Sequence, residues 1–219
     1  MMKRILCYGD SNTWGHDPEN GAKRVPDEAR WPMELERLLG VEYRVVEEGL
    51  CGRWSGSLAF AAGDVDIPWN GYQYFLGCFR SQKPLSLVMI MLGTNDLQKA
   101  KELEPEYTGK MLKEYVKAIK EICELSGDKV PEILLIAPIA IDESIVDNEV
   151  FNEIFGAQSL PKSEKLAGVI EEAAKECGVH FLRAEDYAKA SKLDGLHMNA
   201  NNHKLLAKAV CDKVREILG

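Results

Sequence analysis

Short, mainly apolar runs alternate along this chain with longer segments in which apolar residues recur every three to four positions. The short runs lack a helical period, and three of them end at a glycine. Runs of this kind are typical of strands buried on both faces of a parallel sheet. We therefore expect five strands, at residues 5–8, 43–48, 87–92, 133–136 and 180–182.

The longer segments predict amphipathic helices. Between residues 105 and 125, apolar side chains such as Met111, Tyr115 and Ile119 fall on one helical face. The same periodicity indicates a helix over residues 161–177 and a last helix that ends near Ile217.

Other segments are less regular. We expect Asp27 to cap a helix that runs to Leu39, because aspartate accepts hydrogen bonds from the first free backbone N–H groups. Residues 54–79 are rich in glycine and aromatic residues, which predicts irregular structure with short helices. A long loop is predicted through Phe151 and Phe155.

Alternation of strands with helices of this length predicts βαβ units. The expected fold class is α/β, a three-layer α/β/α sandwich around a five-stranded parallel sheet. The sequence contains no internal repeat, low-complexity tract or linker, so we expect residues 1–219 to form one domain.

Composition and charge exclude several classes of function. The chain is 46% hydrophobic and 28% charged, with a formal net charge of −8, whereas nucleic-acid and anionic-membrane surfaces need clustered basic residues. No apolar run approaches the roughly 20 residues of a membrane span, and the start of the chain has too short an apolar run for a signal peptide. We expect a cytoplasmic protein that binds neither nucleic acid nor membrane.

Six cysteines are scattered along the chain without a C-x-x-C pair. Free thiols in a reducing compartment are the better interpretation than disulfides. No pair of cysteines or histidines has the spacing of metal ligands, so we expect neither a metal nor another cofactor.

Residues suited to acyl transfer follow the predicted strand ends. In a parallel sheet, ligands bind outside the carboxyl ends of the strands. Ser11 follows the first strand, Gly49 ends the second, and Asn95 follows the third. Asp194 and His197 lie in the loop before the last helix.

Acyl transfer needs a nucleophile, a base, a group that orients the base, and donors for the oxyanion. Ser11 is the candidate nucleophile and His197 the candidate base. Asp194, three residues earlier, can orient the imidazole. The expected oxyanion donors are the N–H groups of Ser11 and Gly49 and the side-chain amide of Asn95. A glycine suits position 49 because a side chain there would block the substrate.

These residues resemble four sequence blocks of the GDSL, or SGNH, hydrolase family. Residues 9–12 (Gly-Asp-Ser-Asn) resemble the first block, Gly49 the second, residues 93–96 (Gly-Thr-Asn-Asp) the third and residues 194–197 (Asp-Gly-Leu-His) the fifth. All occur in the order of the family and span most of the chain. The resemblance implies a flavodoxin-like SGNH hydrolase fold and a Ser-His-Asp triad.

Three longer segments look like the bacterial arylesterase and acyltransferase branch of that family, at residues 4–11, 46–50 and 90–96. This resemblance implies a serine esterase for short-chain esters, in a branch where some members also transfer acyl groups to alcohols, and a homo-oligomer, since oligomers are common there. The family's usual leucine after the serine is Asn12 here, so packing or substrate contacts beside the serine are expected to differ. Asp10 and Asp96 are expected to brace turns, and we hypothesise that Trp14 and Trp54 line the acyl pocket.

Other functions stay open at this point. A carbohydrate O-acetylesterase, a thioesterase or a lysophospholipase would share the same blocks. A metal-dependent phosphoesterase could use acids at strand ends, such as Asp10 and Asp96, but would need clustered histidines, and the chain has four in total. A non-catalytic flavodoxin-like binding module would leave Asp194 and His197 without a task.

Overall fold

The strands of the computed structural model, which describes residues 2–21, 23–56 and 69–219, form one sheet in which all pairs are parallel. Its order is β2-β1-β3-β4-β5. The strands are β1 (Lys3–Gly9), β2 (Tyr43–Gly49), β3 (Leu87–Met91), β4 (Glu132–Ala137) and β5 (His180–Arg183). The five predicted strands are therefore confirmed, each with slightly different ends.

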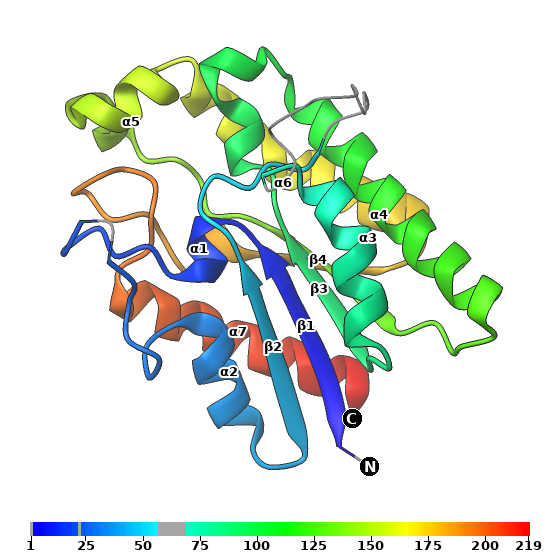
Figure 1. Ribbon diagram of the computed structural model, residues 1–219. Coiled ribbons are helices and arrows are strands. Elements are labelled where there is room, and N and C mark those ends of the chain that lie inside the picture. Colours follow the sequence, from blue (N-terminus) through cyan, green and yellow to red (C-terminus); the bar gives the residue numbers. More distant parts are fainter. Residues whose placement is uncertain (1, 22, 57–68) are drawn as a thin grey trace.

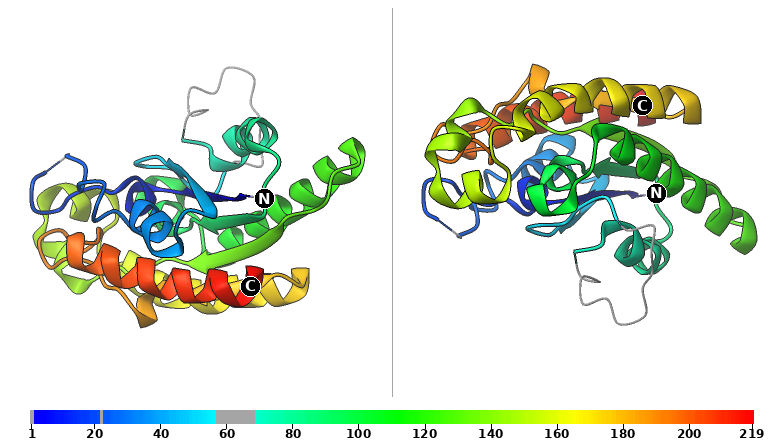
Figure 2. Two further views of the ribbon diagram at one scale, coloured as in Figure 1. Left: turned by 90° about the horizontal axis from the view of Figure 1, so that it is seen from below. Right: turned by 90° about the horizontal axis from the view of Figure 1, so that it is seen from above.

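Helices cover both faces of this sheet (Figures 1 and 2). Side chains alternate along β1, so Ile5 and Cys7 face one layer while Leu6 and Tyr8 face the other. The first layer contains α2 (Trp31–Leu39) and α7 (Ala200–Leu218), and the second contains α3 (Gly71–Gln82), α4 (Pro105–Ser126) and α6 (Ser159–Cys177). The three-layer α/β/α prediction is confirmed.

The sheet order gathers the functional segments at one edge. β1 lies between β2 and β3, and Gly9 pairs in register with Gly49 on one side and Met91 on the other. The two chain ends lie together at the opposite end of the sheet (Figure 1), where Lys3 Nζ donates to the carbonyl of Leu218 at 2.7 Å. The turns that follow β1, β2 and β3 are thus neighbours in space.

The helix predicted from Asp27 begins later than expected. α2 starts at Trp31, and the carboxylate of Asp27 accepts from Arg30 Nη1 at 2.6 Å instead of capping the helix. Residues 26–30 form a turn in which the N–H groups of Ala29 and Arg30 both donate to the carbonyl of Pro26. The N–H groups of Ala29 and Arg30 are therefore bonded within this turn, and the helix begins only at Trp31.

Of two segments without a regular pattern, the first was predicted to contain short helices and the second to be a loop, and both contain helices. α3 occupies residues 71–82, and Asn70 caps it by accepting from the N–H of Gln73 at 3.3 Å. Residues 57–68 of the same stretch lie outside the described residues. The predicted loop around Phe151 contains a 3₁₀-helix, η3 (Glu143–Asp147), and α5 (Glu149–Ile154).

The remaining short elements are α1 (Ser11–Trp14) and the 3₁₀-helices η1 (Thr94–Leu97), η2 (Lys99–Lys101) and η4 (Ala184–Asp186). Across the described part of the chain, every helix is too short or too polar to cross a lipid bilayer.

Candidate active site

Ser11 is the first residue of α1, a single helical turn placed directly after β1. Asp10 caps this turn through its Oδ1 atom, which accepts from the N–H of Asn12 at 2.9 Å. The turn closes where the N–H of Gly15 donates to the carbonyl of Ser11 at 2.8 Å. The hydroxyl of Ser11 is therefore presented from a fixed backbone at the carboxyl edge of the sheet.

His197 reaches Ser11 from the loop before α7. Its Nε2 atom lies 2.9 Å from Ser11 Oγ, and its Nδ1 atom lies 2.7 Å from Asp194 Oδ2. The three side chains come from positions up to 186 residues apart. The structure thus brings together the predicted nucleophile, base and orienting carboxylate at hydrogen-bond distances.

The carboxylate of Asp194 is held by its own loop. Its Oδ1 atom accepts from the N–H groups of Leu196 and His197, both at 2.9 Å. Burial by itself would raise the pKa of Asp194, but the hydrogen bonds from the His197 ring and from these two N–H groups outweigh it, so its pKa is lowered. Asp194 therefore stays ionised and favours the His197 tautomer that carries its proton on Nδ1.

The predicted oxyanion donors flank Ser11 on the two neighbouring strands. Asn95 lies in η1 after β3, and Gly49 ends β2. Asn95 Nδ2 donates to the carbonyl of Arg53 at 3.0 Å, and its Oδ1 accepts from Gln98 Nε2 at 2.9 Å. An amide nitrogen carries two hydrogens, so one of them is left for a substrate oxygen.

The structure explains the glycine at position 49 differently from the expectation that a side chain there would block the substrate. A Cβ atom at this position would lie 2.0 Å from the backbone nitrogen of Trp14 and 2.5 Å from the carbonyl carbon of Thr13. The backbone of α1 therefore fills the space that we had assigned to the substrate. A glycine here allows the serine turn to pack directly against the end of β2.

Arg53 ties these strand ends together, although nothing in the sequence pattern marks it. Its Nη1 atom donates to the carbonyls of Gly9 at 2.9 Å and Glu48 at 2.5 Å. Its guanidinium carbon lies 4.2 Å from the centre of the Tyr8 ring, a cation–π contact, and the residue is buried. Because its own carbonyl accepts from Asn95, Arg53 links all three strand ends of the site.

Asp10 and Asp96 brace turns, as expected. Besides the cap made by Asp10, Asp96 accepts from the N–H of Ser55 at 2.7 Å and from Thr108 Oγ1 at 2.5 Å. Both carboxyls are buried, and burial raises the pKa of each. The pKa of Asp10 rises to about 7, although its hydrogen bond from the N–H of Asn12 acts to lower it.

The two tryptophans assigned to the acyl pocket lie on different segments. Trp14 ends α1 and is half-buried, with the guanidinium of Arg24 5.2 Å from its ring centre. Trp54 is buried, with Lys101 Nζ 4.1 Å from its ring centre and the Tyr107 ring stacked at 6.4 Å. Their contact with an acyl group stays a prediction.

Two other aromatic rings lie directly against His197. The His16 ring is 4.0 Å from it between centroids, and the Phe151 ring of α5 is 5.2 Å away. Phe151 was predicted to lie in a loop, and no sequence motif marks either residue as a contact of His197. Burial, and next the proximity of His197, lower the pKa of His16, so this second imidazole stays neutral beside the first.

His16 also completes a group of potential metal ligands that the sequence spacing did not reveal. In the described residues, ligand atoms of His16, Asp194 and His197 lie within 4.8 Å of one another. Both ring nitrogens of His197 are already engaged, one by Ser11 and one by Asp194. An ion could bind His197 only by displacing one of these partners, so the arrangement favours acyl transfer over metal binding.

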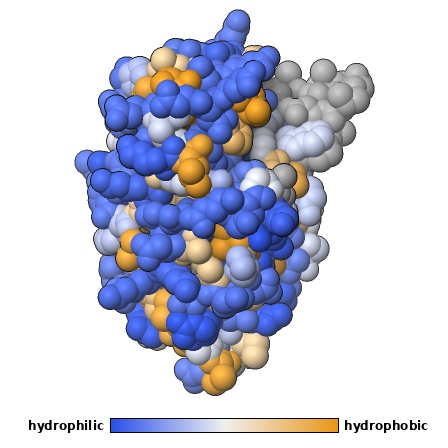
Figure 3. Space-filling model, turned by 90° about the vertical axis from the view of Figure 1, so that its left-hand side faces the viewer, coloured by the Kyte–Doolittle hydropathy of each residue, from blue (hydrophilic) through white to orange (hydrophobic). Residues whose placement is uncertain are grey.

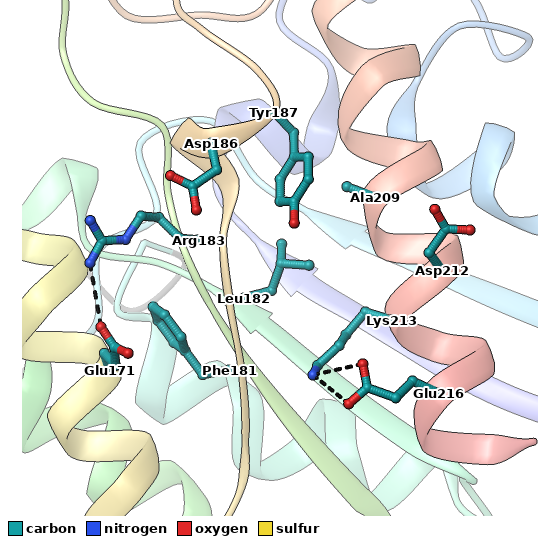
Figure 4. A pocket seen from close by; sticks show the side chains of 10 residues that line it. All are labelled: Glu171, Phe181, Leu182, Arg183, Asp186, Tyr187, Ala209, Asp212, Lys213 and Glu216. Carbon is teal, nitrogen blue, oxygen red and sulfur yellow. Dashed lines mark hydrogen bonds and ion pairs between the residues drawn. The ribbon is translucent and has the colours of Figure 1, made fainter.

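A separate pocket of about 510 Å³ lies beside the edge strand β5, between α6 and α7 (Figure 4). Its charged side chains are largely paired: Arg183 with Glu171, and Lys213 with Glu216. No serine, cysteine or histidine is among the residues that line it. It therefore lacks the groups needed for acyl transfer.

Comparisons with known proteins identify a family and similar folds. The model of a family described as GDSL-like Lipase/Acylhydrolase matches residues 5–210. A carbohydrate acetylesterase family member from Sinorhizobium meliloti is 30% identical, with a TM-score of 0.89 over 100% of both chains. The inhibitor-bound aryl esterase of M. smegmatis is 30% identical, with a TM-score of 0.88 over 99% of this chain and 100% of the other.

A more distant structure shares the fold alone. A member of the lipolytic protein G-D-S-L family from Veillonella parvula is 16% identical, with a TM-score of 0.63 over 99% of this chain and 98% of the other. No match was found among curated protein sequences.

Proposed function

This chain belongs to the GDSL-like lipase/acylhydrolase family, and on that basis we propose that it is a serine esterase that hydrolyses short-chain carboxylic esters. The observation that carries the proposal is the continuous hydrogen-bonded series from Ser11 Oγ through His197 to Asp194, at 2.9 and 2.7 Å. The aryl esterase and acetylesterase similarities support the class of reaction.

In the first half of the reaction, Ser11 Oγ attacks the ester carbonyl carbon while its proton passes to His197 Nε2. Asp194 stabilises the imidazolium that results. The carbonyl oxygen becomes negatively charged and accepts from the N–H groups of Ser11 and Gly49 and the amide of Asn95. The tetrahedral intermediate then expels the alcohol, which takes the proton from His197 and leaves an acyl group on Ser11.

In the second half, water enters the place of the departed alcohol. His197 Nε2 removes a proton from the water as its oxygen attacks the acyl carbon. Collapse of the second intermediate breaks the bond to Ser11 Oγ, which recovers its proton from His197 and releases the carboxylic acid. When another alcohol takes the place of water, the same steps transfer the acyl group to that alcohol. None of these steps requires a cofactor.

A substrate series tests the proposed class. We expect p-nitrophenyl acetate and butyrate to be hydrolysed with higher kcat/KM than p-nitrophenyl octanoate and decanoate, and phenyl acetate faster than acetylated sugars. A clear preference for acetylated monosaccharides would instead support a carbohydrate O-acetylesterase. A preference for acyl thioesters or lysophospholipids would contradict the short-chain assignment.

A further inference from the structure

Asn12, which stands where the family usually has leucine, contacts both peptide groups that flank His197. Its Oδ1 atom accepts from the N–H of Met198 at 2.9 Å, and its Nδ2 atom donates to the carbonyl of Leu196 at 3.1 Å. The side chain is buried, with 2% of the residue exposed. The amide therefore holds the catalytic histidine's backbone from both sides.

The same residue is anchored to the serine turn. Asn12 directly follows Ser11 in α1, and its backbone N–H is fixed by Asp10 Oδ1 at 2.9 Å. Within the described ranges, three hydrogen bonds join residues 10–16 to residues 194–198. One is the bond between Ser11 Oγ and His197 Nε2, and the side chain of Asn12 makes the other two.

Asp194 cannot perform this task. It orients the imidazole and accepts from two N–H groups, but all of these contacts lie within residues 194–197. They define the shape of the loop without fixing the distance of that loop from the serine.

We propose that Asn12 is a positioning residue that fixes the loop carrying His197 at the distance from Ser11 that proton transfer requires. The inference rests on the proposed esterase function. Proton transfer in such an array depends steeply on geometry, and a displacement of about 1 Å can cost about 10²-fold in rate. Only a side chain that is both donor and acceptor satisfies the Leu196 carbonyl and the Met198 N–H together.

The test compares wild type with Asn12→Leu, a change that nearly keeps the shape of the side chain and removes both hydrogen-bonding groups. We expect kcat for p-nitrophenyl acetate to fall about 10- to 100-fold with KM within about twofold, because the loss affects the reacting groups and not substrate binding. The rate at which a fluorophosphonate labels Ser11 should fall in parallel.

Asn199→Ala provides a matched control. Asn199 lies two residues beyond His197 and caps α7 by accepting from the N–H of Asn202 at 3.0 Å, so its loss lowers stability without releasing the His197 peptide groups. We expect kcat of this variant to stay within about twofold of wild type. Thermal unfolding of both variants shows that the compared proteins are folded.

If Asn12→Leu does not fold, Asn12→Asp replaces it, since aspartate keeps the acceptor for Met198 and loses the donor for Leu196. A folded Asn12 variant with wild-type kcat and labelling rate would overturn the inference, as would an equal loss in Asn199→Ala. Failure of the proposed esterase function can be told apart from failure of this inference. Wild type would then hydrolyse no ester, while the rate of Ser11 labelling would still report the effect of Asn12.

Discussion

At the scale of single residues, the side-chain amide of Asn95 carries two hydrogens on its nitrogen, and the proposed mechanism assigns one of them to the substrate. The other is bonded to the carbonyl of Arg53, and Gln98 fixes the orientation of the amide through its oxygen. We expect Asn95→Ala to lower kcat about 10²- to 10³-fold with little change in KM, as loss of an oxyanion donor does. Steady-state kinetics with p-nitrophenyl acetate measures both constants.

Gln98→Ala is the control for this prediction. It removes the group that orients the amide but leaves the donor, so its kcat should fall much less than that of Asn95→Ala. Equal losses in the two variants, or wild-type kcat in Asn95→Ala, would contradict the assignment of Asn95 as a donor.

The residues that the structure brings together at the candidate site could be predicted because strand ends and loop spacing are local features. Ser11 and Asn95 directly follow apolar strands, and Asp194 lies three residues before His197. Arg53 and His16 could not be predicted, since their partners lie on other segments and no periodicity or motif marks them. Their roles depend on the sheet order, which a single sequence does not reveal.

At the scale of elements, α5 places an aromatic side chain beside the base. The Phe151 ring packs 5.2 Å from the His197 ring and 6.3 Å from that of His16. In the proposed mechanism the leaving alcohol takes its proton from His197, so we expect a side chain beside this imidazole to lie close to the alcohol. We expect Phe151→Ala to lower the kcat/KM ratio of phenyl acetate to ethyl acetate severalfold.

Val150→Ala on the same helix is the control, because Val150 is 61% exposed. It should leave the ratio of the two esters unchanged. An unchanged ratio in Phe151→Ala as well would show that α5 does not contribute to the alcohol side of the site.

The elements that the sequence predicted well are those with an uninterrupted period. The long helices α4, α6 and α7 were recognised because apolar residues recur on one face over 22, 19 and 19 residues. α3 was anticipated only as a short helix without bounds in the stretch 54–79, because Gly77 lies within it and its stability comes from burying Phe75 and Phe79 in the core. α5 is six residues long, too short for a periodic signal.

At the scale of the whole molecule, a buried histidine couples stability to pH. His203 of α7 accepts from the N–H of Trp31 at the start of α2, and burial, followed by the proximity of His197 and Arg30, lowers its pKa to about 3. In the unfolded chain its pKa is about 6.5. Between these values the unfolded chain binds one more proton, so the folded state loses about 1.4 kcal/mol per pH unit as pH falls.

Replacing His203 removes its contribution to the pH dependence of stability. We expect the free energy of unfolding of wild type to fall relative to that of His203→Gln by about 1.4 kcal/mol per pH unit between pH 6 and 4, by urea denaturation. The raised pKa of Asp10 makes the folded state more stable as pH falls, and it does so equally in both proteins. The difference between their free energies of unfolding therefore cancels the effect of Asp10. Parallel pH dependences would contradict the neutral buried state of His203.

The expected homo-oligomer stays a prediction. Exposed apolar side chains recur every fourth residue along η3 and α5, at Val146, Val150 and Ile154. Figure 3 shows apolar patches on an otherwise mainly hydrophilic face. Light scattering should give a mass that is a multiple of 24.5 kDa, and a mass of 24.5 kDa at micromolar concentration would contradict the expectation.

The most direct test of the serine mechanism is hydrolysis of p-nitrophenyl acetate by wild type and Ser11→Ala, each with a chelator present. The mechanism predicts full wild-type activity in chelator and a loss of several orders of magnitude in the variant, as removal of a triad member produces. Wild-type activity in Ser11→Ala would show that this serine is not the nucleophile, and loss of activity in chelator would show that a metal ion takes part.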